Sequence, residues 1–88
     1  MKYDPYQILH APVMSESVFD LVESQNKLVF ICHIEATKRQ IRQAFEEMFE
    51  VKVQKVNTQI TPTGTKRAYI RLTADHSAMD VALSLGMF

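Results

Sequence analysis

The sequence is short of cysteine, glycine and long apolar runs, and its formal net charge is zero. The single cysteine, Cys32, excludes an internal disulfide and suits a reducing cytosol. The longest apolar run, residues 28–32, is far too short to span a bilayer. The first residues, MKYDPYQ, lack the charged-then-apolar pattern of a signal peptide. We therefore expect a soluble cytoplasmic protein that does not insert into membranes.

The residues that build catalytic and metal sites are also sparse. The two glycines, Gly64 and Gly86, cannot form a glycine-rich phosphate loop. Cys32 and His33 are adjacent, so in a strand they point to opposite faces, and the other two histidines have no near partner in the sequence. The glutamates clustered at residues 46–50 are typical of a solvated helix end. We expect no catalytic site, no metal and no cofactor.

The 88 residues, 47% of them hydrophobic, suit one domain (residues 1–88) with a modest core. Apolar periodicity predicts helices that begin after Ser15, Thr37 and Ser77, and strands at residues 6–9, 28–34, 51–60 and 66–73. The strand at 28–34 is apolar at almost every position, as in a strand buried on both faces. The alternation slips within 51–60, which predicts a bulge near residues 54–55. This order predicts an α+β domain with a mainly antiparallel sheet.

The charges are unevenly distributed along this neutral chain. Eight of the ten lysines and arginines fall between residues 38 and 71, and residues 51–73 hold five cations and no acid. In the strand at 66–73, Arg67, Tyr69 and Arg71 share one face, with an aromatic ring between two guanidiniums. Arginine pairs with phosphate through a forked geometry, and tyrosine stacks on bases. Alternation alone, however, is more typical of a solvated face.

Neighbouring features favour nucleic acid over a merely solvated face. Lys52 and Lys55 lie on the partner strand, which also carries the polar VNT at residues 56–58. The TPTGT loop at residues 61–65 joins the two strands, with the Lys66–Arg67 pair at its mouth, and a loop of this kind can reach into folded RNA. Together with the acid-free run, these features predict a basic surface that binds RNA.

The ATKRQ segment at residues 36–40 points to the same partner. Thr37 and Gln40 form a T-x-x-Q capping box, which predicts a helix start. Lys38 and Arg39 then occupy the first turn, where each cation costs about 0.3–1 kcal/mol beside the positive end of the helix dipole. The arrangement sharpens a helix start as a phosphate site, and an external polyanion would offset its cost.

The segment ATKRQIRQAFEEMFEVKVQKVNTQITPTGTKRAYIRL, residues 36–72, resembles the archaeal form of a universal ribosomal protein family. This family lies at the rim of the polypeptide exit tunnel and is the twenty-third of the large-subunit series. The shared features are ATK at the helix start, the VNT strand and the TP-x-G-x-K-[KR]-A-Y turn and strand. The segments NKLVFIC (26–32) and DVALSLGMF (80–88) also look like the archaeal members.

The resemblance implies a three-layer α/β/α domain with antiparallel strand order 1-2-4-3 that is a structural component of the large ribosomal subunit. It implies binding to large-subunit rRNA near the exit tunnel, contact with neighbouring ribosomal proteins, and a cytoplasmic location on the ribosome. Carried to the matching positions, the rRNA contacts are Thr37, Lys38, Arg39, Lys55, Asn57, Thr58, Lys66, Arg67, Tyr69 and Arg71.

The family also has a docking surface near its first helix, opposite the rRNA contacts, for factors that meet the nascent chain, such as the signal recognition particle. The matching residues here are Ser15, Glu16 and Ser17. Many members read S/T-E-K at this point. The S-E-S of this sequence keeps the acid and lacks the lysine.

Two other classes of protein are weighed against this interpretation. A free-standing RNA-binding module of the RRM type is also an α+β sandwich, but it needs paired aromatics on an open sheet face, and residues 28–34 read as covered on both sides. A small ferredoxin-like enzyme such as an acylphosphatase needs an Arg–Asn pair in a tight phosphate loop, for which the sequence offers no candidate.

Overall fold

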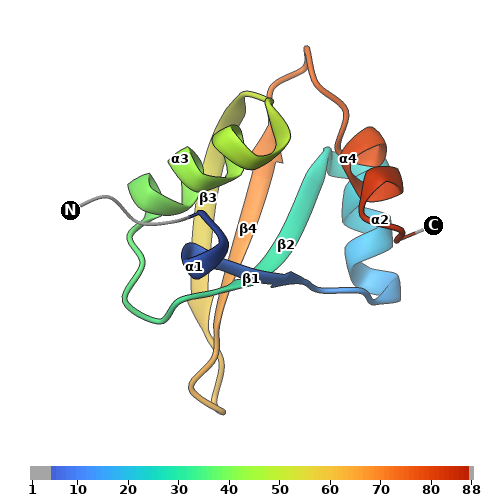
Figure 1. The fold of residues 1–88 in the computed structure, drawn as a ribbon. Coiled ribbons are helices and arrows are strands. Elements are labelled where there is room, and N and C mark those ends of the chain that lie inside the picture. The colour runs from blue at the N-terminus through green and yellow to red at the C-terminus, as the bar shows by residue number, and fades with distance from the viewer. Residues whose placement is uncertain (1–4, 88) are drawn as a thin grey trace.

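Four strands form one antiparallel sheet in the order β1-β2-β4-β3, as the resemblance implies (Figure 1). The computed structural model describes residues 5–87, with strands β1 (Leu9–Pro12), β2 (Lys27–Cys32), β3 (Val53–Ile60) and β4 (Lys66–Leu72). The helices are α1 (Pro5–Ile8), α2 (Glu16–Gln25), α3 (Lys38–Phe49) and α4 (Ala78–Ser84). The predicted α+β class is confirmed. Residues 1–4 and 88 of the predicted domain lie outside the described range.

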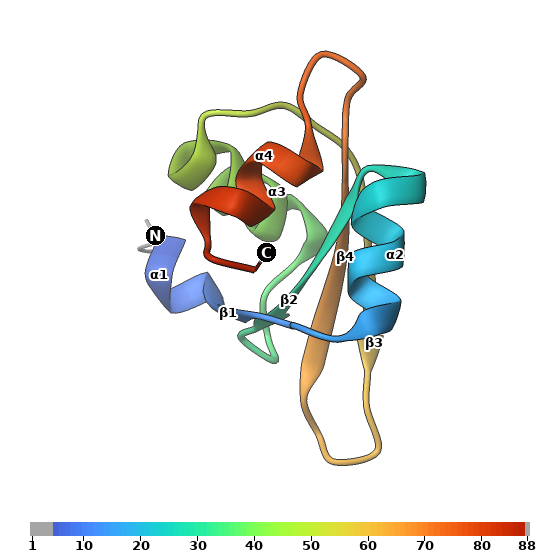
Figure 2. The ribbon, with the colours of Figure 1, turned by 90° about the vertical axis from the view of Figure 1, so that its right-hand side faces the viewer.

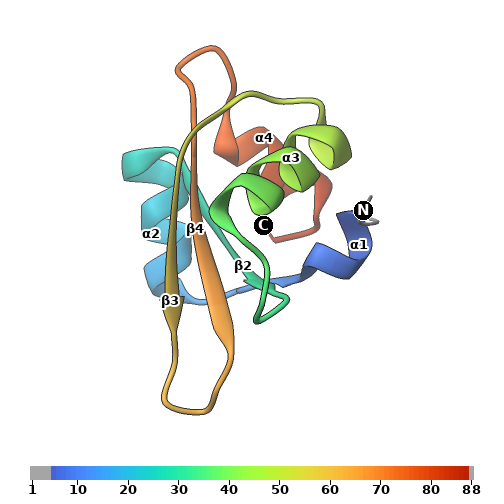
Figure 3. The same cartoon turned by 90° about the vertical axis from the view of Figure 1, so that its left-hand side faces the viewer.

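Helices cover both faces of the sheet, which gives three layers. α2 packs on one face, and α1, α3 and α4 lie on the other (Figures 2 and 3). The ring of Phe30 in β2 lies 5.6 Å from that of Phe45 and 6.0 Å from that of Phe49, both on α3. Its neighbour Val29, only 1% exposed, points the other way, toward α2. β2 is therefore buried on both faces, as its continuous apolar run predicts.

The pairing of β4 fixes which side chains share a face. Ala68 stands opposite Phe30, so Ala68 and the β4 residues in phase with it face α3, where Ala68, Ile70 and Leu72 are buried. Tyr69 stands opposite Val29 and therefore lies on the face that carries α2. The predicted separation of an apolar and a polar face along β4 is confirmed. The apolar face lies on the α3 side of the sheet, and the polar face lies on the α2 side.

The bulge predicted near residues 54–55 is present in β3. The register between β3 and β4 shifts between Val53 and Lys55. The Val53 N–H donates to Oε2 of Glu46 on α3 at 2.9 Å, and the same oxygen lies 3.8 Å from Nε of Arg42. Glu46 was expected to be part of a solvated acidic cluster, but it is half-buried and satisfies a backbone donor beside the bulge.

The first strand begins later than predicted. Residues 6–9 were expected to be a strand, but the chain forms the short helix α1 up to Ile8 and only then enters β1. Pro5 suits a first helical position because its fixed φ matches the helix and its missing N–H would have no helical partner there. Ile8 and Leu9 are 5% and 3% exposed, so the apolar residues that suggested a strand are buried from the helix end. β2 likewise ends at Cys32, two residues earlier than expected.

The predicted helix starts are confirmed by their caps. Thr37 Oγ1 accepts from the Gln40 N–H at 3.2 Å, and Gln40 Oε1 accepts from the Thr37 N–H at 2.9 Å, which completes the capping box. Ser15 and Ser77 each accept from the backbone N–H three residues on, at 3.3 Å. These signals are local in sequence, so they do not depend on the tertiary fold.

Asn26 joins the end of α2 to the segment that leads into α4. It adopts a left-handed conformation with φ of 56°. Its side-chain Nδ2 donates to the carbonyls of Leu72, Thr73 and His76 at 3.4, 3.3 and 2.9 Å, and its Oδ1 accepts from the Ala78 N–H at 2.7 Å. One amide therefore satisfies backbone groups on a segment far away in the sequence.

Candidate nucleic-acid interface

Three cations stand side by side across the sheet. Arg71 on β4 is opposite Lys27 on β2 and also opposite Lys55 on β3. Directly opposed residues of antiparallel strands lie on the same face, so the three side chains form a row on the α2 side of the sheet. Among the described residues, none of the three has an ion-pair partner. Like charges in this position destabilise the free protein, which makes the row a strong candidate for binding a polyanion.

The face next to this row carries further polar side chains. Asn57 stands opposite Tyr69, and Gln59 stands opposite Arg67. The Tyr69 hydroxyl donates to Gln59 Oε1 at 3.3 Å, which orients the phenol along the sheet. We call the set Lys27, Lys55, Asn57, Gln59, Arg67, Tyr69 and Arg71 the basic face.

Arg67 has an unsatisfied donor within the basic face. Its Nε is inaccessible to solvent and has no hydrogen-bond partner in residues 5–87. A buried donor of this kind normally finds an acceptor, but an atom closed to solvent cannot be reached from outside the chain, so an external contact of Arg67 must use the terminal nitrogens of its guanidinium. A phosphate oxygen, which accepts a forked pair of N–H bonds from arginine, is a suitable acceptor.

The predicted contacts on α3 form a second group, separate from the basic face. Thr37, Lys38 and Arg39 are all exposed, and α3 packs on the sheet face that α2 does not cover. The capping box already uses the Thr37 side chain, so Lys38 and Arg39 supply the free charge at this helix start. The structure thus divides the predicted site between two sides of the sheet.

Lys66 and Thr58 also belong to the α3 side. Lys66 stands opposite Cys32, on the face away from Arg67, and its Nζ donates to the carbonyls of Ala36 at 2.6 Å and Ile34 at 3.5 Å. Lys66 therefore braces the segment before α3. Lys66 and Arg67 both lie where β4 leaves the loop, but they point to opposite faces of the sheet because adjacent strand residues alternate. Thr58, opposite Ala68, is half-buried on the α3 side.

The loop between β3 and β4 holds its own shape at the end of a projecting hairpin (Figures 1 and 2). The Thr61 N–H donates to the Thr65 carbonyl at 2.8 Å, and the Gly64 N–H donates to the Thr61 carbonyl at 2.9 Å. Gly64 has φ of +83°, a conformation that favours glycine. The exposed tip is therefore preformed and extends beyond the body of the domain.

The predicted docking residues lie at the start of α2. Ser15 is the N-cap, and Ser15, Glu16 and Ser17 are all exposed. Because α2 packs on the same face of the sheet as Arg67, Tyr69 and Arg71, the docking residues do not lie on the opposite surface as expected. They are on the same side, at the start of the helix that packs against β2.

Sequence reasoning missed two members of the basic face. Lys27 is isolated in the sequence, directly before the apolar run of β2, and only the strand register places it beside Arg71. Gln59 looks like an ordinary polar strand residue until its bond to Tyr69 is known. In the part of the chain that the structure describes, no cluster of three metal-binding side chains occurs. Within residues 5–87, no helix combines the length and the apolar composition of a membrane span.

Comparison with known proteins identifies the family. The sequence profile of the family described as Ribosomal protein L23 matches residues 7–85. The chain is 47% identical over 85 residues to the large ribosomal subunit protein uL23 of the archaeon Methanothermobacter thermautotrophicus, covering 97% of this chain and 99% of that protein. It is 49% identical over 85 residues to the large ribosomal subunit protein uL23 of Cyberlindnera jadinii, of which it spans 60%. The chain therefore belongs to the ribosomal protein L23 family.

Proposed function

We propose that this protein is a structural component of the large ribosomal subunit, located on cytoplasmic ribosomes, and that it binds large-subunit rRNA through the basic face. The observation that carries the proposal is the row of Lys27, Arg71 and Lys55, which are adjacent on three strands and have no ion-pair partner within residues 5–87. Its relatives are named as large-subunit proteins. The protein is not an enzyme, and neighbouring ribosomal proteins are its other partners.

Repulsion among three cations at cross-strand spacing raises the free energy of the isolated fold. A phosphate backbone passing over the sheet converts that repulsion into attraction and releases condensed counterions. Arg71 and Arg67 can each hold a phosphate with a forked pair of hydrogen bonds, while Tyr69 offers a ring to a base or ribose. Phosphate contacts of this kind fix the position and orientation of the protein.

Lys38 and Arg39 extend the interface to the start of α3. Their exposure and the positive end of the helix dipole favour a second phosphate segment there. The projecting hairpin of β3 and β4 extends the sheet beyond the body of the domain and presents side chains on both faces, Asn57 on the α2 side and Thr58 and Lys66 on the α3 side. A folded RNA that surrounds the hairpin would reach both groups of cations, whereas a single strand lying on one face would not.

We assign the start of α2 to a docking role. Ser15, Glu16 and Ser17 are exposed, and α2 carries further exposed acids at Asp20 and Glu23. This acidic surface would repel a phosphate backbone, so it stays free when rRNA covers the basic face. A factor that meets the nascent chain, such as the signal recognition particle, is the proposed partner. A free-standing RRM-type module is not favoured, because α2 covers the β2 part of the face that such a module would use.

A matched pair of substitutions tests the proposed rRNA surface. Arg71→Gln and Arg42→Gln each remove one exposed guanidinium, and only Arg71 belongs to the basic face. Loss of a charge-assisted hydrogen bond, about 1.5–3 kcal/mol, predicts that Arg71→Gln binds a large-subunit rRNA fragment about tenfold or more weakly. Arg42→Gln should bind like the parent. Equal affinities for the parent and Arg71→Gln, or equal losses in both variants, would contradict the assignment.

A further inference from the structure

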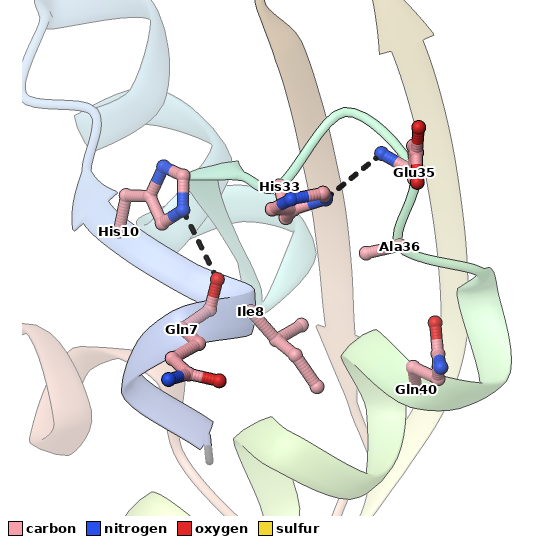
Figure 4. A pocket seen from close by; sticks show the side chains of 7 residues that line it. All are labelled: Gln7, Ile8, His10, His33, Glu35, Ala36 and Gln40. Atoms are coloured by element: carbon pink, nitrogen blue, oxygen red, sulfur yellow. Dashed lines mark hydrogen bonds between the residues drawn. The ribbon is translucent and has the colours of Figure 1, made fainter. Parts of the chain in front are cut away.

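A cavity of about 370 Å³ lies outside the basic face, where α1, the segment after β2 and the start of α3 meet (Figure 4). Its volume is within the range of small-molecule sites, roughly 300–1,000 Å³. The floor is apolar. Ile8 and Ala36 are 5% and 4% exposed, and their side chains point toward one another across the hollow. An occupant must therefore present an apolar surface to this floor.

Two imidazole rings stand at the upper wall. The His10 and His33 rings meet edge to face, with centroids 6.3 Å apart and planes at 82°. His10 Nε2 donates to the Gln7 carbonyl at 3.1 Å, and His33 Nδ1 accepts from the Glu35 N–H at 3.1 Å. These bonds hold both rings in place, and they put the proton of neutral His33 on Nε2. Fixed imidazoles offer a stacking surface to a flat heterocycle.

The rim adds hydrogen-bonding groups of both kinds. Gln40 Oε1 is occupied by the Thr37 N–H at 2.9 Å, so its Nε2 remains as a donor. The exposed Glu35 side chain supplies a carboxylate acceptor on the same side of the hollow as Gln40 (Figure 4). Two cations are close to the cavity. Lys66 Nζ donates to the carbonyl of the lining residue Ala36 at 2.6 Å, and Lys38 is two residues after Ala36 in the sequence. An apolar floor, fixed rings, a donor, an acceptor and nearby cations match a nucleobase joined to phosphate.

We propose that this cavity holds one unstacked base of the bound RNA, and that the base carries an exocyclic amine, as adenine, guanine and cytosine do. The Glu35 carboxylate accepts from the exocyclic amine, and Gln40 Nε2 donates to a ring nitrogen or carbonyl of the base. The inference rests on the proposed rRNA-binding function and adds a base-reading site to its phosphate contacts. Uracil lacks the amine and is the discriminating control.

The test compares oligoadenylate, oligouridylate and adenosine monophosphate alone as probes of the full chain. Affinity is measured for each, and the ring protons of His10 and His33 are followed by NMR. We expect oligoadenylate to bind about threefold to tenfold more tightly than oligouridylate, because one or two hydrogen bonds contribute a difference of this size. We also expect oligoadenylate to shift the NMR signals of the His33 ring protons. Equal affinities without ring shifts would overturn the proposal. Ring shifts with adenosine monophosphate but none with oligoadenylate would assign the cavity to a free nucleotide and overturn the RNA assignment.

Two variants separate the cavity from general stacking by adenine. Glu35→Ala removes the acceptor from an exposed position and should leave the fold intact, while Ala36→Leu fills the hollow. In both variants, the ratio of the affinity for oligoadenylate to the affinity for oligouridylate should be close to one. Arg71→Gln should weaken both oligonucleotides and keep the preference, so failure of the basic face is distinguishable from failure of the cavity. A parental preference retained by a folded Glu35→Ala chain would overturn the proposal.

Discussion

Among single residues, Asn26 has the largest structural role that the sequence does not reveal. Its side chain satisfies four backbone groups between Leu72 and Ala78, and its backbone is left-handed. The contacts join residues 46 to 52 positions apart, so no local pattern could predict them. By contrast, the caps at Ser15, Thr37 and Ser77 were predictable because donor and acceptor lie three residues apart.

Substitution of Asn26 tests this role. Asn26→Ala loses the four bonds and also places an alanine at positive φ, so we expect the free energy of unfolding to fall by about 2–4 kcal/mol. Asn26→Gly loses the same bonds without the backbone strain and should be about 1 kcal/mol more stable than Asn26→Ala. Chemical denaturation of the three proteins provides the measurement. An Asn26→Ala chain as stable as the parent would show that these bonds contribute nothing.

The buried Cys32 thiol should make the free energy of unfolding fall as the pH rises above neutral. Burial raises the pKa of its thiol, and the nearby Lys66 ammonium lowers it in part. The folded chain therefore holds the thiol proton to higher pH than the unfolded chain. Stability from this group is fully present below the unfolded pKa and is lost as the pH rises toward the folded pKa. The parent should lose more stability than Cys32→Val on passing from neutral to alkaline pH. Parallel stability curves for the two proteins would contradict the pKa direction.

At the scale of secondary structure elements, α3 carries charges that oppose its own dipole. Lys38 and Arg39 occupy its first turn, and its last turn has no basic residue. Lys38→Glu and Arg39→Glu should each stabilise the free protein by about 0.3–1 kcal/mol. Each should also weaken binding to a large-subunit rRNA fragment, because a phosphate contact is replaced by repulsion. Thermal unfolding and rRNA affinity, measured on the same samples, check both effects.

The other end of α3 offers a matched control. Glu47 is exposed near the negative end of the helix dipole, so Glu47→Lys should also stabilise the free protein by about 0.3–1 kcal/mol. It should leave rRNA binding unchanged or slightly stronger. If Lys38→Glu destabilises the chain, or if Glu47→Lys weakens rRNA binding as much as Lys38→Glu does, the account of the α3 start is wrong.

The elements also show where sequence patterns stop being informative. The apolar run of β2 and the regular alternation of β4 identify these strands because each pattern covers nearly the whole strand, of six residues in β2 and seven in β4. The four residues of α1 are too few to show a helical period, and their apolar content resembled a strand. Only the burial of Ile8 against the body of the fold settles the conformation of this segment.

At the scale of the whole molecule, the register of the sheet turns a neutral chain into one with a basic face. The sequence predicts that cations concentrate after residue 38, but Lys27 joins them only through its pairing with Arg71. The strand order follows from the family resemblance, whereas the division of the predicted contacts between two sides of the sheet requires the three-dimensional arrangement. Lys66 and Arg67, adjacent in sequence, have different roles because β4 alternates.

The most direct test of the central claim, that the basic face meets an RNA backbone, is the salt dependence of affinity for a large-subunit rRNA fragment. With roughly five to eight phosphate contacts, the log–log slope of affinity against salt concentration should be about −3.5 to −7. Replacing Lys27, Lys55 and Arg71 together by glutamine should make this slope shallower by about 2–3, at about 0.7–0.9 per lost contact. A parental slope near zero, or an unchanged slope in the folded triple variant, would contradict the account.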